Sequence, residues 1–201
     1  MAMRPGTERK LLDAAEELFF TRGIAATPVD VVLERAGVSS ATLYRRYPSK
    51  ESLVAAALER RHDDWLVTWD AVVATAPDDR GRLLSVFDAL DAYRSTPAGS
   101  RWCAFLGTAA EYAETPDEVR RVLDLETETL RGRLTGFAAA LTGSGSRADA
   151  LAGQLLLVVS GYLAMRLRDP ALGTDTARTI AVALVDAAAS SPADVSGAAG
   201  G

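Results

Sequence analysis

The stretch that most restricts the fold is residues 27–53, TPVDVVLERAGVSSATLYRRYPSKESL, because it carries the start and stop signals of two short helices. Thr27 is a favourable N-cap residue, Pro28 suits the first helical position, and Asp30 completes a capping box. An apolar stripe follows, and Gly37 stands where a helix commonly ends in a left-handed turn. The pattern predicts a first short helix that ends at Gly37.

A second short helix is predicted directly after it. Ser39 or Ser40 supplies the N-cap, and the segment TLYRRY forms the body of the helix. Pro48 ends it, because proline disfavours helical geometry in the residue before it. Two short helices joined by a tight turn are typical of a helix-turn-helix, whose second helix enters the major groove of DNA.

Residues 42–53 read Thr-Leu-Tyr, a basic pair, an aromatic residue and then Pro-Ser-Lys-Glu-x-Leu. This segment resembles the signature of TetR/AcrR-type bacterial transcriptional regulators, and the resemblance covers residues 7–60. It implies a repressor that binds a palindromic operator as a homodimer and is released by a small-molecule effector. Beyond residue 60 the chain is similar to the family only in length and helical pattern.

The remaining sequence predicts an all-α protein of about nine helices. Apolar residues make up 48 % of the 201 residues, and clusters of β-branched residues bounded by turns are scarce. We expect a DNA-binding domain over residues 1–50, a ligand-sensing and dimerisation domain over 51–190, and a disordered tail over 191–201. The helices are expected at about residues 7–22, 28–36, 40–47, 49–76, 78–93, 100–113, 116–141, 146–168 and 174–189.

The distribution of charge agrees with a DNA-binding N-terminus. The net charge is −5, yet residues 1–50 hold eight basic and six acidic side chains, whereas residues 51–201 hold fourteen and twenty-one. The N-terminus lacks the apolar core of a signal peptide, and no apolar run reaches the ~20 residues of a membrane span. With a single cysteine, Cys103, these features favour a cytoplasmic protein without a membrane partner.

The candidate DNA contacts cluster on the second helix of the motif. Arg45 is the best base reader, because its guanidinium fits guanine O6 and N7. The resemblance implies that Ser40, Ala41 and Thr42 face bases or the backbone, and that Tyr44 contacts a phosphate or a thymine methyl group. The alternatives are that Tyr44 merely covers the surface and that Arg46 is simply solvated. Phosphate contacts are expected from Thr27, Arg46 and Lys50.

Aromatic side chains gather in the C-terminal part, where the resemblance places an effector pocket. Pockets of this kind are mostly apolar with a few polar groups. The alternative is that these side chains are ordinary core, and nothing in the sequence selects a ligand. The candidate pocket residues are Trp69, Phe87, Trp102, Phe105, Glu111, Tyr112, Phe137 and Tyr162.

The last two predicted helices are apolar on almost every side. The segments LAGQLLLVVSGYLAM and IAVALVDAAA leave little polar surface for solvent, and a chain of this size has little room to bury both. A homodimer through residues 147–168 and 174–189, packed as a four-helix bundle, solves this problem. The alternative is that both are central core helices of a monomer.

A different class, a helical enzyme or lipid-handling protein with an incidental helix-turn-helix, finds little support. No phosphate loop, metal-ligand spacing or catalytic set is recognisable, so we expect no cofactor, metal or enzymatic activity. His62, the only histidine, follows two arginines and precedes two aspartates, which predicts a solvated position. A third possibility is a DNA-binding protein without an effector.

The long helix over residues 49–76 has no proline or glycine. We expect it to be the only continuous link between the aromatic cluster and the recognition helix. A pendulum-like tilt of this helix is the predicted switch, since a ligand shifts an equilibrium only if it binds the two forms with different affinity.

Overall fold

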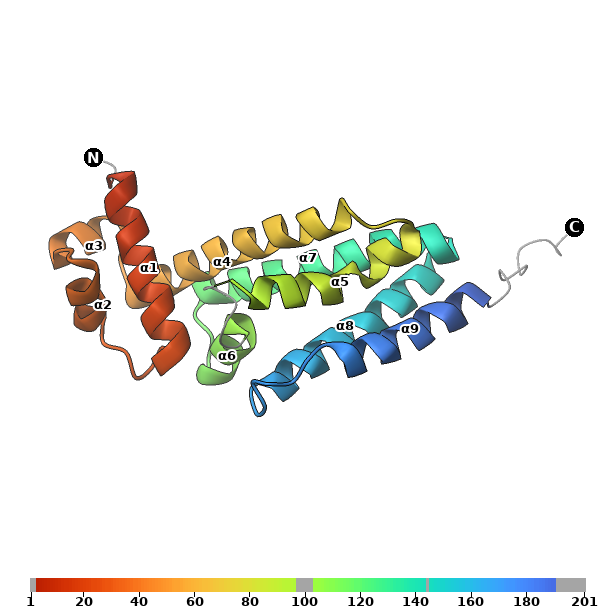
Figure 1. The fold of residues 1–201 in the computed structure, drawn as a ribbon. Coiled ribbons are helices and arrows are strands. Elements are labelled where there is room, and N and C mark those ends of the chain that lie inside the picture. The colour runs from red at the N-terminus through yellow and green to blue at the C-terminus, as the bar shows by residue number, and fades with distance from the viewer. Residues whose placement is uncertain (1–2, 97–102, 144, 191–201) are drawn as a thin grey trace, which may run out of the picture.

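The computed structural model describes residues 3–96, 103–143 and 145–190. Within these ranges the chain forms nine helices and no strand, so the predicted all-α fold is confirmed (Figure 1). The expectations for Trp102 and for the tail 191–201 lie outside the described residues. The helices are α1 (Pro5–Arg22), α2 (Val29–Ala36), α3 (Ser40–Arg46), α4 (Lys50–Val73), α5 (Asp79–Arg94), α6 (Ala104–Glu111), α7 (Asp117–Thr142), α8 (Ser146–Arg166) and α9 (Asp175–Ser190).

Helices α1, α2 and α3 form a small unit at one end of the molecule (Figure 1). Gly23 and Gly37 end α1 and α2 with φ of 92° and 65°, values that L side chains rarely adopt, which confirms the predicted stops. Ser39 caps α3 and accepts a hydrogen bond from the backbone amide of Thr42. The tight helix-turn-helix follows from these signals.

Two predicted helix starts are wrong by one or two residues. Helix α1 begins at Pro5, with Arg4 as its N-cap, which is two residues before the expected start at residue 7. The N-cap of α2 is Pro28 rather than Thr27, and no side chain caps that helix. The reason for the second shift is that the Thr27 hydroxyl faces inward, where it donates a 2.7 Å hydrogen bond to the Gly23 carbonyl oxygen.

Helix α4 connects the N-terminal unit to the rest of the molecule. Ser49 and Ser52 form a reciprocal capping box at its start, with two hydrogen bonds of 3.0 Å. Its 24 residues span about 36 Å. It packs against α1, α5 and α7.

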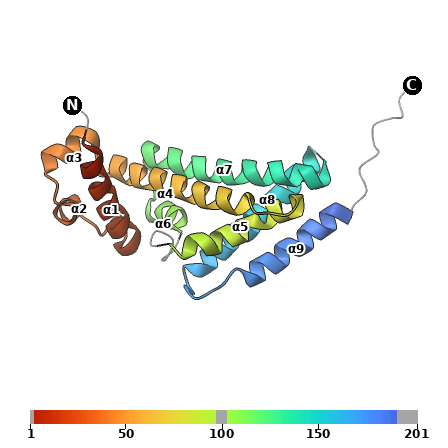
Figure 2. The ribbon, with the colours of Figure 1, turned by 45° about the horizontal axis from the view of Figure 1, so that its top comes forward.

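The C-terminal part is a bundle of α4, α5 and α7, against which α8 and α9 pack as an antiparallel pair (Figures 1 and 2). By length and composition alone α8 would suffice to cross a membrane. In this fold α8 packs between α7 and α9, which accounts for its apolar side.

The buried apolar residues form two clusters. The first cluster joins α1–α3 to the start of α4, and it also takes in Ala104 of α6 and Val119 and Val122 of α7. The second cluster fills the bundle around Trp69, Phe87 and Leu155, all of which are fully buried. The core of the N-terminal unit therefore continues into α6 and α7 rather than stopping at residue 50.

Candidate nucleic-acid interface and effector cavity

Helix α3 presents one face to the core and the other to solvent. Leu43 is fully buried and Tyr47 is 4 % exposed, so these two side chains anchor the helix. On the opposite face Ser40, Ala41 and Arg45 are exposed, and Tyr44 is 50 % exposed. The structure thus brings together most of the candidate base contacts on one open surface, with Thr42 partly buried beside them.

The two arginines of α3 differ in their surroundings. Arg45 makes no ion pair with any described residue. Arg46 pairs with Glu8 of α1 at 3.0 Å and lies over the Tyr47 ring. The Tyr47 hydroxyl donates a 2.8 Å hydrogen bond to the same carboxylate. Burial, assisted by Glu8, raises the pKa of Tyr47 to about 12, so this hydroxyl keeps its proton.

Two predicted phosphate contacts point away from the surface of α3. Thr27 is 1 % exposed, and its hydroxyl is occupied by backbone carbonyl oxygens. The Lys50 ammonium donates to the Ile24 carbonyl oxygen and lies 5.7 Å from the centre of the Phe19 ring. Both side chains hold the segment between α1 and α2 in place. Sequence could not reveal this, because the contact depends on the path of that segment.

A small cavity lies among α4, α5, α6, α7 and α8, with a volume of about 70 Å³. Ligand pockets are typically about 300–1,000 Å³, so a large ligand requires the helices to move. A second cavity of about 140 Å³ lies beside it, between α6, α7 and α8. Among the predicted pocket residues, Phe105 lines both cavities.

The other described members of the predicted pocket set lie elsewhere. Trp69 and Phe87 are fully buried, and the Trp69 indole N–H donates to the Ser85 hydroxyl at 2.9 Å. Phe137 packs edge-on against Trp69. Trp69 and Phe87 are therefore core side chains, Phe137 is partly buried against them, and none of the three lines either cavity.

Three further members of that set also lie outside the lining of both cavities. Glu111 is exposed at the end of α6 and accepts a hydrogen bond from the Ala25 backbone amide. Tyr112 packs against the first apolar cluster. Tyr162 is 5 % exposed and belongs to the second cluster.

The sequence reasoning missed the charged residues that line the cavities. Arg61 of α4 lies in the stripe formed by Val54, Leu58 and Trp69, and it is 6 % exposed. Glu126 of α7 takes a position in the stripe of Val122 and Leu130. A charged side chain inside an apolar helical stripe was the signal that could have identified both.

The expectation that His62 is solvated is wrong. His62 is 4 % exposed, and its ring lies edge-on to Phe105 at 6.3 Å. Burial lowers its pKa, and the nearby charges of Asp63 and Arg133 act in opposite directions. Within the described ranges no group of three metal-binding side chains occurs.

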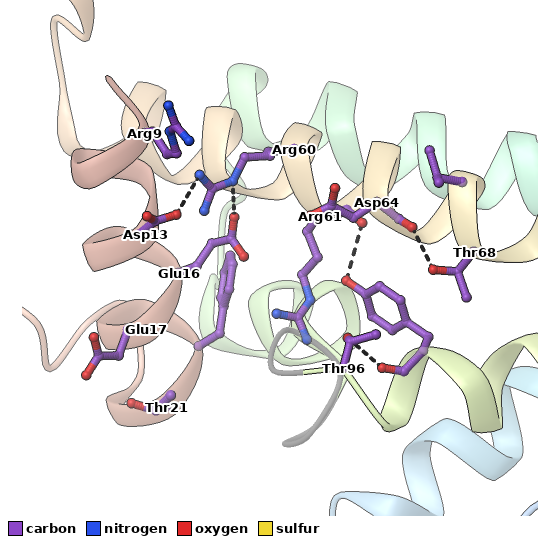
Figure 3. Close-up of a pocket in the computed structure, with 13 residues that line it drawn as sticks. Arg9, Asp13, Glu16, Glu17, Thr21, Arg60, Arg61, Asp64, Thr68 and Thr96 are labelled. Carbon is purple, nitrogen blue, oxygen red and sulfur yellow. Dashed lines mark hydrogen bonds and ion pairs between the residues drawn. The ribbon is translucent and has the colours of Figure 1, made fainter. Parts of the chain in front are cut away.

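An open groove of about 880 Å³ separates α1 from α4 and the end of α5 (Figure 3). Across it the Arg60 guanidinium reaches Asp13 at 2.9 Å and Glu16 at 2.5 Å, both on α1. The next residue, Arg61, lines both the groove and the smaller cavity. The same turn of α4 therefore lines the smaller cavity through Arg61 and attaches α1 through Arg60.

This architecture defines a class of protein. A helix-turn-helix unit, in which the second helix of the motif (α3) is exposed, is joined to a larger helical bundle. Residues 11–57 match the family of bacterial regulatory proteins named tetR. The segment that carries α1, α2 and α3 is therefore similar to the DNA-binding unit of that family.

Two curated relatives and one solved structure illustrate the relationship. The HTH-type transcriptional repressor KstR2 of Rhodococcus jostii is 35 % identical over 47 % of this chain and 48 % of its own length. The HTH-type transcriptional activator FasR of Mycolicibacterium smegmatis is 38 % identical over 42 % and 40 %. The chain therefore spans about half the length of these two relatives or less.

The fold likeness extends over most of the chain. The crystal structure of a TetR-family transcriptional regulator from Streptomyces coelicolor superimposes with a TM-score of 0.81, covering 92 % of this chain and 97 % of that one. The sequence identity is 24 %, so this comparison concerns the fold alone.

Proposed function

We propose that the chain is a sequence-specific DNA-binding transcriptional regulator. The observation that carries this proposal is the outward face of α3, where Ser40, Ala41, Tyr44 and Arg45 stand exposed above the buried anchors. Side chains on a recognition helix reach base edges from this kind of face. Arg45, with no ion pair among the described residues, is the proposed guanine reader.

Arg46, Thr27 and Lys50 have weaker support as DNA contacts. Arg46 is exposed, but a contact with a DNA phosphate would require it to give up its ion pair with Glu8. Thr27 and Lys50 support the segment before α2, and their proposed contribution is to hold α2 and α3 in position. Ser40 and Tyr44 are the exposed hydroxyl residues of α3 that could reach a phosphate.

A homodimer through α8 and α9 is part of this proposal. An apolar face on these two helices lies open to solvent: Leu157 is 74 % exposed, Met165 50 % and Ile180 49 %, with Gly161 and Ala183 exposed between them. A face of this kind is typical of an interface. A two-fold dimer binds a two-fold symmetric operator, with half-sites about 34–36 Å apart or more.

We also propose that a small molecule regulates DNA binding. The two cavities and the links from α4 and α6 to the N-terminal unit support it. The relatives named above include one repressor and one activator. We favour a ligand-released repressor, because a ligand that enlarges these small cavities must displace helices that hold α1.

Selection of bound DNA from a random duplex pool tests the function. The expected outcome is a two-fold symmetric motif, recovered by the purified chain without any added ligand. A pool with no enriched motif would refute sequence-specific binding.

A further inference from the structure

The two cavities beside α6 share one wall. Both are lined by Cys103, Phe105, Glu126, Leu130 and Leu163, so they are two lobes on either side of the same side chains. Apolar groups form most of the remaining lining of the larger lobe, which adds Leu106, Leu123 and Leu156. Together the two lobes form a mostly apolar site in which Glu126 lines both lobes and three arginines, Arg61, Arg94 and Arg166, line the smaller one.

The larger lobe has the size of a single six-membered ring. Its volume is about 140 Å³, and an apolar protein cavity of roughly 150 Å³ is enough to bind benzene. The smaller lobe, about 70 Å³, has room for a short substituent or ordered water. A ligand that binds without displacing the helices is therefore a molecule with a single ring.

Glu126 is the chemically distinctive group of this site. It is partly buried, and its carboxylate accepts a 3.5 Å hydrogen bond from the neighbouring Thr127 hydroxyl. No described basic side chain forms an ion pair with it. Burial raises the pKa of Glu126 to about 7, while the Thr127 hydroxyl lowers it slightly.

The basic side chains that line the smaller lobe are engaged elsewhere. Arg61 of α4 lies over the rings of Phe20 and Tyr93. Arg94 of α5 donates to backbone carbonyl oxygens beyond α8, at 3.0 Å.

Arg166 and Cys103 also line the smaller lobe beside Glu126. Arg166 of α8 lies over the Tyr162 ring at 6.0 Å. Cys103 precedes α6, and burial raises the pKa of its thiol to about 11, so it stays neutral. Glu126 thus lines both lobes as a carboxylate that forms no ion pair with any described basic side chain.

We propose that this site binds a small aromatic or alicyclic amine, with its ring in the larger lobe and its ammonium group paired with the Glu126 carboxylate. The pairing would give the Glu126 carboxylate a cationic partner, which it lacks among the residues that the structure describes, and hydrogen bonds to a charged group in such a setting are among the stronger ones. The inference deepens the proposed effector response, since it names the class of effector.

Benzylamine, benzoate and benzyl alcohol form a matched set of probes with one ring and different charge. Isothermal titration at pH 8 should give the tightest binding for benzylamine. Glu126→Gln should weaken benzylamine roughly tenfold or more and leave benzyl alcohol unchanged, which shows that the cavity is intact. Glu128→Gln, an exposed change on the same helix, is the control and should have no effect.

The pH dependence supplies an independent readout. Because the amine must pair with an ionised carboxylate, benzylamine affinity should rise between pH 6 and 8 in the native chain and stay flat in Glu126→Gln. Tighter binding of benzoate, or equal benzylamine binding to both variants, would overturn the proposal. DNA selection without ligand is unaffected by these results, so failure of the amine site and failure of the DNA-binding function are distinguishable.

Discussion

The carboxylate of Glu111, at the end of α6, accepts a 2.9 Å hydrogen bond from the backbone amide of Ala25, in the segment between α1 and α2. The other end of α6 carries Phe105, which lines both cavities. Eight residues of helix therefore join the cavities to the helix-turn-helix unit. The expectation that the long helix is the only such link is wrong, because α6 provides a second one.

Glu111→Ala should loosen this second link without unfolding the chain. The amide of Ala25 loses its acceptor, a contribution of about 1 kcal/mol, so its hydrogen exchange should accelerate several-fold. Glu114→Ala, an exposed change three residues further on, is the control and should leave the exchange unchanged. Equal exchange of Ala25 in both variants would mean that Glu111 does not restrain this segment.

Arg60→Gln should weaken the attachment of α1 to α4. Glu16, whose side chain is 11 % exposed, would lose its partner, and the free energy of unfolding should fall by about 1–2 kcal/mol at pH 7. Arg35→Gln removes an exposed pair with Glu17 and should cost at most about 0.5 kcal/mol. Urea unfolding measures both, and equal losses would contradict the assigned role of Arg60.

Glu126→Gln should change how stability depends on pH. The pKa of Glu126 is raised by burial from 4.5 to about 7, so between these values the folded state binds more protons than the unfolded state. Its contribution to stability is therefore present below pH 4.5 and is lost as the pH rises to 7. The variant should be more stable than the native chain at pH 8 and should lose this advantage at pH 4.5.

Comparing the two proteins at each pH removes the opposite effect of His62, whose lowered pKa disfavours the folded state as the pH falls. Urea unfolding at pH 4.5, 6 and 8 measures the difference. A constant difference between the two proteins across this range would contradict the assigned pKa of Glu126.

Leu157→Glu should dissociate the proposed dimer and leave the protomer folded. Leu157 is 74 % exposed on α8, so a charge there meets water in the monomer and an apolar surface in the dimer. Val67→Glu, at a site 70 % exposed on α4, is the matched control. Sedimentation should show a monomer for the first variant and a dimer for the second. A dimer in both would remove this face from the interface.

The sequence predicted the elements better than the site. Helix stops at Gly23 and Gly37 and the cap at Ser39 are local, so residue type alone identified them. The exposed face of α3 also followed from helical periodicity around Leu43 and Tyr47.

The effector cavity could not be predicted in the same way. Aromatic side chains mark a core as readily as a pocket, and Trp69 and Phe87 turned out to fill the core completely. Whether a cavity remains between the helices depends on how five helices pack together. The apolar stripe of any one helix does not contain this information. The charged residues Arg61 and Glu126 were better signals of the site. Burying a charged side chain in an apolar helical stripe costs free energy, so its presence there indicates a specific role.

The central claim is that the outward face of α3 reads DNA sequence, and Arg45→Ala tests it most directly. The motif selected from a random pool should be compared for the native chain, Arg45→Ala and the control Arg131→Ala, an exposed arginine on α7. The account predicts that Arg45→Ala loses the preference at one position in each half-site, a cost of about 1–3 kcal/mol, while the control keeps the full motif. An unchanged motif for Arg45→Ala would contradict the role of Arg45 as the base reader of α3.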